Sequence, residues 1–478
     1  MELDSNACYR AARARDRRFD GRFYVAITST HIYCRPICTA RAAKRKNMRF
    51  YSHAAAAERA GFRPCLRCRP ERAPGLAPVD AVSRLVGAAM AGIEEHALSS
   101  ARVGDLAASL GVSDRHLRRV TEAELGVSPI ELAQTQRLLL AKRLLRETSL
   151  NLTDIAFASG FGSVRRFNAL FKSRYALSPR AIRGKSIDTD TLSVQLEFRP
   201  PLAWKSLLAY LRLRAIPGVE AADDTHYRRT VAIGAAQGWI AVSMHAGGSA
   251  LNLEISPTLT PVIGAVIGRV KQLFDLGAAP DSVSTVLRQD DILAATVRRL
   301  PGLRVAGAFD GFELAVRTVL GQQVSVKGAS TISGRWAEGF GEPIATPYRE
   351  LNRLSPTAER MAQVPAEQVA RLGIVGARAR CLEGLAQAVT QRKIMLTYAS
   401  NVEEQIDNLM HLPGIGHWTA NYIAMRALHW PDAFPTGDLV LMRAAQSNQK
   451  QLQRRSEAWR PWRAYAAHYL WQSLGVSP

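Results

Sequence analysis

Two close pairs of cysteines constrain the fold of the N-terminal part of the chain more than any other feature. Cys34 and Cys38 form the first pair, and Cys65 and Cys68 follow about thirty residues later. A tetrahedral zinc ion takes four soft ligands from two short turns, and this spacing supplies them. We therefore predict one zinc ion on these four thiols, in a reducing compartment rather than in a disulfide framework. The spacing alone leaves a purely structural zinc site open.

The charge of the chain indicates a nucleic-acid partner. The 478 residues carry a formal net charge of +22, and the chain is long enough for three or four domains. Residues 1–185 hold 33 Lys and Arg against 16 Asp and Glu, so most of the excess lies in this part. No secretory signal, lipidation signal or long apolar run accompanies the charge. We expect a cytoplasmic protein that binds double-stranded DNA and no membrane.

Two copies of a helix, a glycine turn and a basic helix follow a linker near residue 75. The first copy covers 103–120, the second covers 153–172, and a long helix over 131–147 joins them. Ser113 is placed to cap the basic helix of the first copy. The arrangement resembles the AraC-type DNA-binding domain, whose second helix enters the major groove. The candidate groove contacts are Arg115, Arg118, Arg119, Arg165, Arg166 and Asn168. In the alternative interpretation, some of the arginines contact only phosphate or solvent.

A glycine-rich turn in the C-terminal part separates two apolar helical segments. The turn is Leu412–Ala420, and the predicted helices cover 402–411 and 419–428. Gly414 and Gly416 allow a tight bend with bare backbone amides, and a helix N-terminus adds positive charge. Such amides bind a DNA phosphate without reading the base sequence. A plain connector between helices uses the same pattern and stays an alternative.

The turn belongs to a set of segments that resembles the helix-hairpin-helix DNA glycosylases, closest to the AlkA type of 3-methyladenine DNA glycosylase II. The resemblance covers the chain from about residue 192 to the C-terminus and implies excision of alkylated bases from DNA. Alternating stretches near 192–198 and 251–255 predict strands of the small α/β domain that precedes the catalytic helices in this family. Besides the turn, the resemblance rests on Asn421-Tyr422, Phe434–Asp438, Trp459–Arg463 and Tyr465–Trp471.

The resemblance implies roles for individual residues of this half. Asp438 would stabilise the positive charge that develops on the sugar and orient the attacking water. Trp418, Tyr422 and Trp471 would line the pocket of a cationic base, which aromatic faces attract. Ordinary core packing is the alternative role of these three side chains. A monovalent cation would lie on the carbonyls of Met410, Leu412 and Ile415.

Three further features refine this expectation. Gln323 stands where the closest family member has a leucine that fills the gap left by the flipped base, and a glutamine can fill that gap and bond to the orphaned base. Trp418 stands where strand-cleaving relatives carry a lysine, so we predict excision without strand cleavage. No cysteine follows Cys381, so the four-cysteine iron–sulfur cluster of some relatives is not expected.

The cysteine-rich segment resembles the N-terminal domain of the Ada family, through Thr30–Cys38, Phe50-Tyr51 and Ala60–Pro70. The resemblance implies that Cys34 accepts a methyl group from a neutral methylphosphotriester in alkylated DNA, with Cys38, Cys65 and Cys68 as supporting zinc ligands. Zinc keeps the thiols deprotonated, which leaves one sulfur nucleophilic. Methylation removes a negative charge beside the DNA, which implies a damage sensor that activates transcription, with RNA polymerase as a partner.

We therefore expect a multidomain chain. The predicted order is a small zinc-bound α/β domain over 1–75, an all-α double helix-turn-helix domain over 76–185, a small α/β domain over 186–300 and an all-α helix-hairpin-helix glycosylase domain over 301–478. The predicted function is excision of alkylated bases such as 3-methyladenine, combined with methyl acceptance and regulation of an adaptive response. The alternative is a transcriptional activator whose glycosylase half binds damage without excising it.

Overall fold

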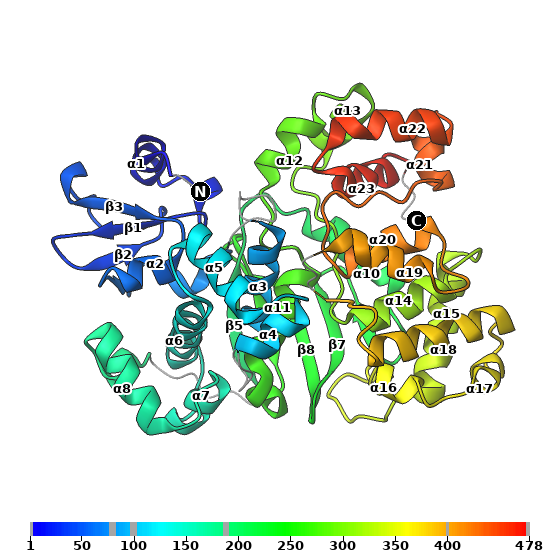
Figure 1. Ribbon diagram of the computed structural model, residues 1–478, viewed down its shortest axis with the longest axis horizontal. Helices are drawn as coiled ribbons and strands as arrows, with labels where there is room; N and C mark the ends of the chain where they lie inside the picture. The colour runs from blue at the N-terminus through cyan, green and yellow to red at the C-terminus, as the bar shows by residue number, and fades with distance from the viewer. Residues whose placement is uncertain (1–2, 76–82, 96–102, 185–190, 398–400, 475–478) are drawn as a thin grey trace. The chain divides into compact units, whose positions relative to one another are not determined.

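The computed structural model describes residues 3–75, 83–95, 103–184, 191–397 and 401–474. The chain forms two compact units, and Figure 1 labels most of their helices and several of their strands. The first unit comprises residues 1–200, 245–271 and 276–279, and the second comprises 201–244, 272–275 and 280–478. Each unit is therefore built from segments that are discontinuous in the sequence.

A four-stranded sheet in the first unit brings the two cysteine pairs together. Its order is β3 (Met48–Tyr51), β1 (Tyr24–Ile27), β2 (Ile32–Cys34) and β4 (Arg63–Pro64). Figure 1 labels β3, β1 and β2 of this sheet. Strand β1 pairs antiparallel with β2 and β3, whereas β2 and β4 run parallel. Cys34 ends β2, and Cys65 directly follows β4. Parallel neighbours end at the same edge of a sheet, so one cysteine of each pair arrives at that edge.

Polar caps set the start of the helix-turn-helix elements. Ser113, Asn151 and Ser163 each accept a hydrogen bond from an amide in the following turn, and Ser128 forms a capping box with Glu131. The helices of both predicted copies and the long joining helix, α6, are confirmed. The helices of this part are α1 (Ser5–Ala14), α2 (Ala54–Arg59), α3 (Arg84–Glu95), α4 (Val103–Ser109), α5 (Asp114–Leu125), α6 (Pro129–Glu147), α7 (Leu152–Ala158), α8 (Val164–Tyr175) and α9 (Pro179–Ile182), with 3-10 turns η1 (Arg17–Phe19), η2 (Arg45–Asn47) and η3 (Pro70–Arg72).

Helix α6 packs a buried lysine against the cysteine-bearing module. Lys142 has no exposed surface, and its Nζ donates to Glu71 at 2.6 Å and to the carbonyl of Cys65 at 3.1 Å. Arg143 of the same helix donates to the carbonyl of Glu71 at 2.5 Å. A buried charge is stable only with such partners. The joining helix and the cysteine module therefore share one core.

Glu71→Gln is expected to destabilise the first unit, because it leaves the ammonium of Lys142 buried beside a neutral amide. Breaking one side of such a pair lowers the free energy of unfolding by about 3 kcal/mol. Burial raises the pKa of Glu71, but the charges of Lys142 and Arg69 outweigh it and hold the pKa below its ordinary value. The pair therefore stabilises the fold above the ordinary glutamate pKa and loses this contribution as the pH falls through the lowered pKa.

Urea unfolding of the full chain, followed by circular dichroism, measures the effect of Glu71→Gln. The difference from wild type should be present at neutral pH and shrink in acid. Glu122→Gln, on the exposed side of α5, is the control and should leave the transition unchanged. An equal stability of Glu71→Gln and wild type at neutral pH would contradict a buried ion pair.

The first unit also holds two strands from the predicted glycosylase half. Strand β5 (Leu192–Glu197) pairs antiparallel with β9 (Ala250–Ile255), with Leu192 opposite Ile255 and Glu197 opposite Ala250. Both strands were predicted from alternation and are confirmed. The 3-10 turn η4 (Pro257–Val262) and helix α11 (Ile263–Leu273) follow β9 in the chain. The first unit therefore includes part of the segment predicted as the small α/β domain.

The second unit combines an antiparallel meander with the helices around the glycine-rich turn. In the meander, β6 (Glu220–Ala222), β7 (His226–Ile233) and β8 (Ala236–Met244) pair in sequence order. Helices α19 and α20 pack side by side (Figure 1). The helices are α10 (Trp204–Arg214), α12 (Pro280–Leu287), α13 (Asp291–Arg299), α14 (Gly311–Leu320), α15 (Val326–Phe340), α16 (Ala358–Met361), α17 (Ala366–Ala370), α18 (Gly376–Thr390), α19 (Val402–Met410), α20 (His417–Arg426), α21 (Leu439–Ala444), α22 (Gln449–Ser456) and α23 (Arg463–Ser473), with the 3-10 turn η5 (Glu457–Trp459).

The predicted fold class is confirmed. A small mixed module carries the cysteines, a helical segment follows it, strands β5 to β9 come next, and the remainder is helical. Within the described ranges, no helix combines the length and the apolar character that crossing a membrane requires.

Candidate functional site

The predicted hairpin lies between α19 and α20, and the two glycines at its tip are exposed. Gly416 is the N-cap of α20, so this helix begins two residues before its predicted start. Gly414 has a φ of +93°, a left-handed conformation that favours glycine, and a Cβ there would lie 3.3 Å from the Cβ of Cys381. Gly416 has no side chain to cap the first amides of α20. The turn therefore has the exposed amides that phosphate binding requires.

The three predicted cation carbonyls belong to the same short turn. Met410 is the last residue of α19, and the carbonyl of Leu412 accepts from the amide of Ile415 at 3.1 Å. Each carbonyl oxygen has a second lone pair, so this bond does not exclude a cation from Leu412. Cation binding stays a prediction.

A second loop is tied to the hairpin by Gln322, to which the sequence assigned no role. Its Nε2 donates to the carbonyl of Gly414 at 2.8 Å and to Oγ1 of Thr419 at 3.1 Å. The adjacent Gln323 is exposed and has a φ of +55°, which is strained for a residue with a Cβ. Backbone strain of this kind is more frequent at functional sites. The predicted gap-filling side chain therefore stands on an exposed loop tip fixed to the hairpin.

Gly416→Ala is expected to weaken DNA binding without weakening the fold. A Cβ at this position meets no atom within 4 Å, and its φ of −92° is open to any residue. The added methyl group would stand over the amides that are predicted to hold a phosphate, and losing one charge-assisted contact weakens affinity by about tenfold. Fluorescence anisotropy with duplex DNA measures the change. Gly247→Ala is the control, because a Cβ at this position also meets no atom within 4 Å. Equal affinities of both variants for DNA would contradict a contact between the hairpin and DNA.

Asp438 is buried at the N-terminus of α21, and both of its carboxylate oxygens accept hydrogen bonds. Oδ1 accepts from the amides of Val440 and Leu441, each at 2.9 Å, and Oδ2 accepts from Nε1 of Trp418 at 2.8 Å. Nε1 of Trp471 lies 3.5 Å from Oδ1. These donors fix the orientation of the carboxylate at the positive end of a helix.

The three predicted pocket aromatics gather around this carboxylate. The rings of Trp418 and Tyr422 stack with centroids 5.1 Å apart and planes 10° apart. The rings of Tyr422 and Trp471 lie 6.2 Å apart at 54°. Trp418 is half-buried, whereas Tyr422 and Trp471 are buried. Helices α20, α21 and α23 thus bring the four residues predicted for catalysis and base binding into one cluster.

The hydroxyl of Tyr422 is hydrogen-bonded to two residues that no sequence motif indicated. Its Oη lies 2.7 Å from Oη of Tyr210 on α10 and accepts from Nη1 of Arg426 at 3.2 Å. Burial raises the pKa of Tyr422, but the cations Arg426 and Arg214 and the bond to Tyr210 outweigh it and lower the pKa to about 7. Tyr210 and Tyr422 are 212 residues apart, and no local pattern marks such a pair.

The six groove candidates are exposed on the second helix of each helix-turn-helix copy. Arg118 lies 3.6 Å from Asp114, and Nη2 of Arg119 lies 3.1 Å from Nδ1 of His116. Exposed interactions of this kind contribute little free energy, so they leave both arginines able to contact DNA. The candidates are Arg115, Arg118 and Arg119 on α5, and Arg165, Arg166 and Asn168 on α8.

The four predicted zinc ligands lie together. The sulfurs of Cys34, Cys38, Cys65 and Cys68 are all within 4.8 Å of one another. Zinc–sulfur bonds of about 2.3 Å place the sulfurs of a tetrahedral site roughly 3.8 Å apart, so this set fits one zinc ion. The amides of Arg35 and Arg67 donate to the sulfurs of Cys68 and Cys65 at 3.3 and 3.4 Å. Such outer bonds orient metal ligands.

Arg35, between the first two cysteines, connects the ligand loop to β5. Its side chain is 2% exposed. Nε donates to Asp20 at 2.8 Å, Nη2 donates to Glu197 at 2.6 Å, and Nη1 donates to the carbonyl of Cys68 at 3.1 Å. Glu197 is 162 residues away in the sequence, which is why the spacing of the cysteines did not reveal this anchor.

Four family descriptions match consecutive parts of the chain. They are the metal binding domain of Ada over 7–71, a helix-turn-helix domain over 106–185, the AlkA N-terminal domain over 193–310, and the HhH-GPD superfamily of base excision DNA repair proteins over 316–460. The order agrees with the order of domains expected from the motifs.

Two relatives and one solved structure extend this result. A probable bifunctional transcriptional activator/DNA repair enzyme AlkA from Mycobacterium tuberculosis is 36% identical over 487 residues, covering 99% of this chain and 97% of that protein. DNA-3-methyladenine glycosylase 2 of Escherichia coli is 34% identical, covering 59% of this chain and 98% of that protein. A 3-methyladenine DNA-glycosylase structure from Archaeoglobus fulgidus has a TM-score of 0.52 at 18% identity, covering 58% of this chain and 97% of that one. This last likeness concerns the fold.

Proposed function

The chain belongs to the family of bifunctional AlkA-type transcriptional activators and DNA repair enzymes, and on this premise we propose that it excises alkylated bases such as 3-methyladenine from double-stranded DNA. The observation that carries the proposal is the hydrogen bond of 2.8 Å from Trp418 to Asp438 beside the stacked rings of Trp418 and Tyr422. It unites a fixed carboxylate with aromatic faces in one cluster. We propose further that the N-terminal half accepts methyl groups and regulates transcription.

Base excision breaks the bond between the sugar and the base, and the electron pair of that bond leaves with the base. Positive charge moves from an alkylated purine to the sugar, where Asp438 stabilises it by electrostatic attraction. Water adds to the sugar carbon and releases a proton to the solvent. Because the alkylated base departs as a neutral molecule, it needs no strong general acid. The rings of Trp418 and Tyr422 attract the cationic base before the bond breaks.

The proposed enzyme excises bases without cleaving the strand. Strand cleavage in this superfamily requires an amine that forms a Schiff base with the sugar. Trp418 occupies the corresponding position, and its indole nitrogen donates to Asp438. The sugar carbon is therefore attacked by water, and the product is an abasic site in an intact strand.

Methyl acceptance is proposed for Cys34. Its sulfur attacks the methyl carbon of a methylphosphotriester, a carbon–sulfur bond forms, and the carbon–oxygen bond breaks to leave an ordinary phosphodiester anion. When bound, zinc keeps the thiols deprotonated. Cys34, Cys38 and Cys68 are partly exposed and Cys65 is buried, so the assignment of Cys34 as the acceptor rests on the resemblance to the Ada family. The transfer is irreversible, so each molecule acts once.

Regulation is proposed to follow from this transfer. Methylating Cys34 removes one negative charge near the DNA, and the six exposed side chains of α5 and α8 supply groove contacts. Stronger binding to a promoter would then report damage, with RNA polymerase as the proposed partner. The exposed position of the five arginines and Asn168 on these two helices supports this role.

The direct test of the glycosylase proposal is incubation of the full chain with methylated duplex DNA. Free 3-methyladenine should appear, and the strand should break only after alkaline treatment of the abasic site. Breaks without alkali would contradict excision by water alone. Tight binding to methylated DNA with no released base would favour the second candidate, a transcriptional activator whose C-terminal half only recognises damage.

A further inference from the structure

Three buried or partly buried guanidinium groups surround the hydroxyl pair behind the proposed base pocket. Arg214 and Arg426 are each 4% exposed, and Arg317 is partly buried. The central carbon of the Arg214 guanidinium lies 3.8 Å from the centroid of the Tyr210 ring, and that of Arg426 lies 5.3 Å from it. These arginines donate to backbone carbonyls and to hydroxyls, among them Oη of Tyr422.

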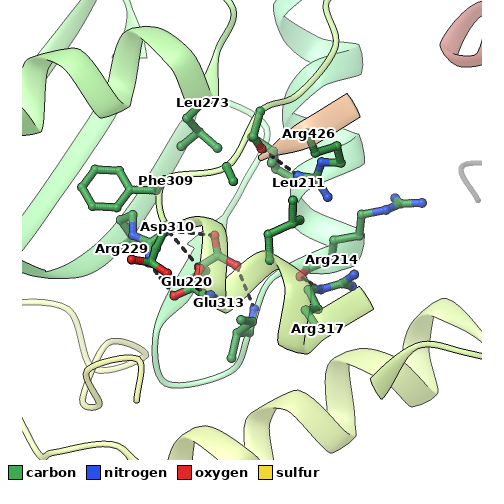
Figure 2. A pocket seen from close by; sticks show the side chains of 14 residues that line it. Leu211, Arg214, Glu220, Arg229, Leu273, Phe309, Asp310, Glu313, Arg317 and Arg426 are labelled. Carbon is green, nitrogen blue, oxygen red and sulfur yellow. Dashed lines mark hydrogen bonds and ion pairs between the residues drawn. The ribbon is translucent and has the colours of Figure 1, made fainter. Parts of the chain in front are cut away.

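The carboxylates of this region are engaged elsewhere. Arg229 pairs with Glu313 at 2.8 Å and with Glu220 at 3.5 Å, and Tyr227 also donates to Glu220. Figure 2 shows these acidic groups gathered with Arg229 at one side of a cavity of about 30 Å³, and Arg214, Arg317 and Arg426 along the other side. In the described part of the chain, no ion pair joins those three arginines to a carboxylate. Glu220 attracts Arg317 and Arg426 without forming an ion pair with either of them. Buried cations that lack a directly paired counter-charge are unfavourable.

The geometry of the two tyrosines supplies a place for that counter-charge. Oη of Tyr210 and Oη of Tyr422 lie 2.7 Å apart, and one hydrogen bond between them uses one phenolic proton. Arg426 donates to Tyr422 as well. Among the described residues, neither hydroxyl has a further acceptor for the second proton. A neutral pair would therefore leave one buried O–H unsatisfied.

We propose that Tyr210 and Tyr422 share a single proton and together carry one negative charge, so that the wall of the base pocket selects cationic damaged bases. The proposal rests on the glycosylase function proposed above and assigns a negative charge to the pocket that binds its cationic substrates. Tyr422 is the ring that stacks on Trp418, so the charge is delocalised over a face of the proposed pocket. Tyr210 acts as a positioning residue, because it reaches the pocket only through Tyr422.

Neighbouring titratable groups agree with this assignment. Burial raises the pKa of Tyr210. The pKa of Tyr422 is lowered to about 7, because the guanidinium groups outweigh its burial. The ring centroid of His468 lies 5.3 Å from that of Tyr210 and 5.0 Å from that of Trp471. Burial and the cations Arg426 and Arg214 lower the pKa of His468 to about 3, so its imidazole is neutral at neutral pH. Burial also raises the pKa of Glu313, whose carboxylate is paired with Arg229 and contacts neither phenol. Of the phenol pair and His468, the phenol pair is thus the group that titrates near neutral pH.

The charge has a defined consequence for recognition. Without it, the buried guanidinium groups would repel a cationic purine, and a unit charge a few ångströms away changes such binding by about tenfold or more. The attraction acts on the bound base and not on the sugar, where charge appears in the transition state. The pair should therefore change the concentration that half-saturates the reaction and leave the maximal rate nearly unchanged.

The first test is an ultraviolet titration of the wild-type full chain, in which tyrosinate has its own absorption band. One of the twelve tyrosines should ionise with a midpoint of about 7. The double variant Tyr210→Phe/Tyr422→Phe should lose this step. Tyr469→Phe, which removes a buried hydroxyl that donates to the carbonyl of Leu300, should keep it. A wild type with no step until the pH nears about 10, the ordinary value for a phenol, would overturn the proposal, as would a step that survives in the double variant.

The second test compares release of cationic 3-methyladenine and neutral hypoxanthine in single-turnover reactions. Tyr422→Phe keeps the stacked ring and removes the charge, so it should raise the half-saturating enzyme concentration for 3-methyladenine about tenfold more than that for hypoxanthine. Equal changes for both bases would overturn the proposal. A tyrosinate step in a chain that releases no base would contradict the glycosylase function instead, so the two failures are distinguishable.

Discussion

Asp438→Asn is expected to lower the rate of base release by about 10²- to 10³-fold, because an amide cannot stabilise the positive charge of the developing sugar cation. The substitution keeps the size of the side chain, and asparagine is as good a helix N-cap as aspartate. If the amide oxygen accepts from Val440 and Leu441 in place of Oδ1, the amide nitrogen faces the indole N–H of Trp418. This mismatch costs about 1 kcal/mol of stability and leaves the protein folded.

The chain contains a matched control for this variant. Asp290 caps α13 through the amides of Ile292 and Leu293 at 3.0 and 3.3 Å, and its Oδ2 accepts from Nε1 of Trp459 at 2.8 Å. The local bonding repeats that of Asp438, with an added ion pair to Arg455. Asp290→Asn should therefore keep base release. If both variants lost base release equally, Asp438 would act only by stabilising the fold. If Asp438→Asn kept full activity, Asp438 would have no role in catalysis.

Cys34→Ala is expected to abolish methyl transfer to the protein, since no other sulfur is proposed as the acceptor. Base release should stay within about twofold of wild type, because independent sites have additive effects. Incubation with DNA that carries labelled methylphosphotriesters measures the label bound to protein. The zinc content of the variant is measured in parallel, because loss of one ligand weakens the site.

Two further variants separate the acceptor from a supporting ligand and from an unrelated thiol. Cys8 is buried outside the four-cysteine cluster, so Cys8→Ala should keep both methyl transfer and zinc. Cys38→Ala should lose methyl transfer together with zinc affinity. Labelling of Cys34→Ala at the wild-type level would show that another residue accepts the methyl group.

The sequence predicted what is local in this fold. Hydrophobic periodicity and the glycines located α19, the turn and α20, and the start of α20 differs by two residues because Gly416 caps the helix. The four cysteines were predicted to meet, and their sulfurs lie within 4.8 Å of one another. Spacing is informative in these cases because each ligand pair or helix cap is fixed by a few neighbouring residues.

The support around the sites could not be predicted in this way. Gln322 holds the hairpin across 92 residues, Glu197 holds Arg35 across 162, and Tyr210 meets Tyr422 across 212. Contacts of this kind depend on how helices and strands pack against one another. Helix or strand periodicity in the sequence does not predict that packing. A single sequence also gives no sign that a buried arginine such as Arg426 lacks a carboxylate partner. The proposed charge of the proposed base pocket therefore depends on side-chain contacts that no local sequence pattern indicates.

The measurement that tests the central claim most directly is a single incubation of the full chain with duplex DNA methylated by a labelled reagent. Label is then counted in free 3-methyladenine and on the protein. If one chain performs both base excision and methyl acceptance, label appears in both places. Label in free 3-methyladenine should be lost in Asp438→Asn, and label on the protein should be lost in Cys34→Ala. Label on the protein without any released base, from a chain that binds the DNA, would contradict the assignment of the C-terminal half as a glycosylase.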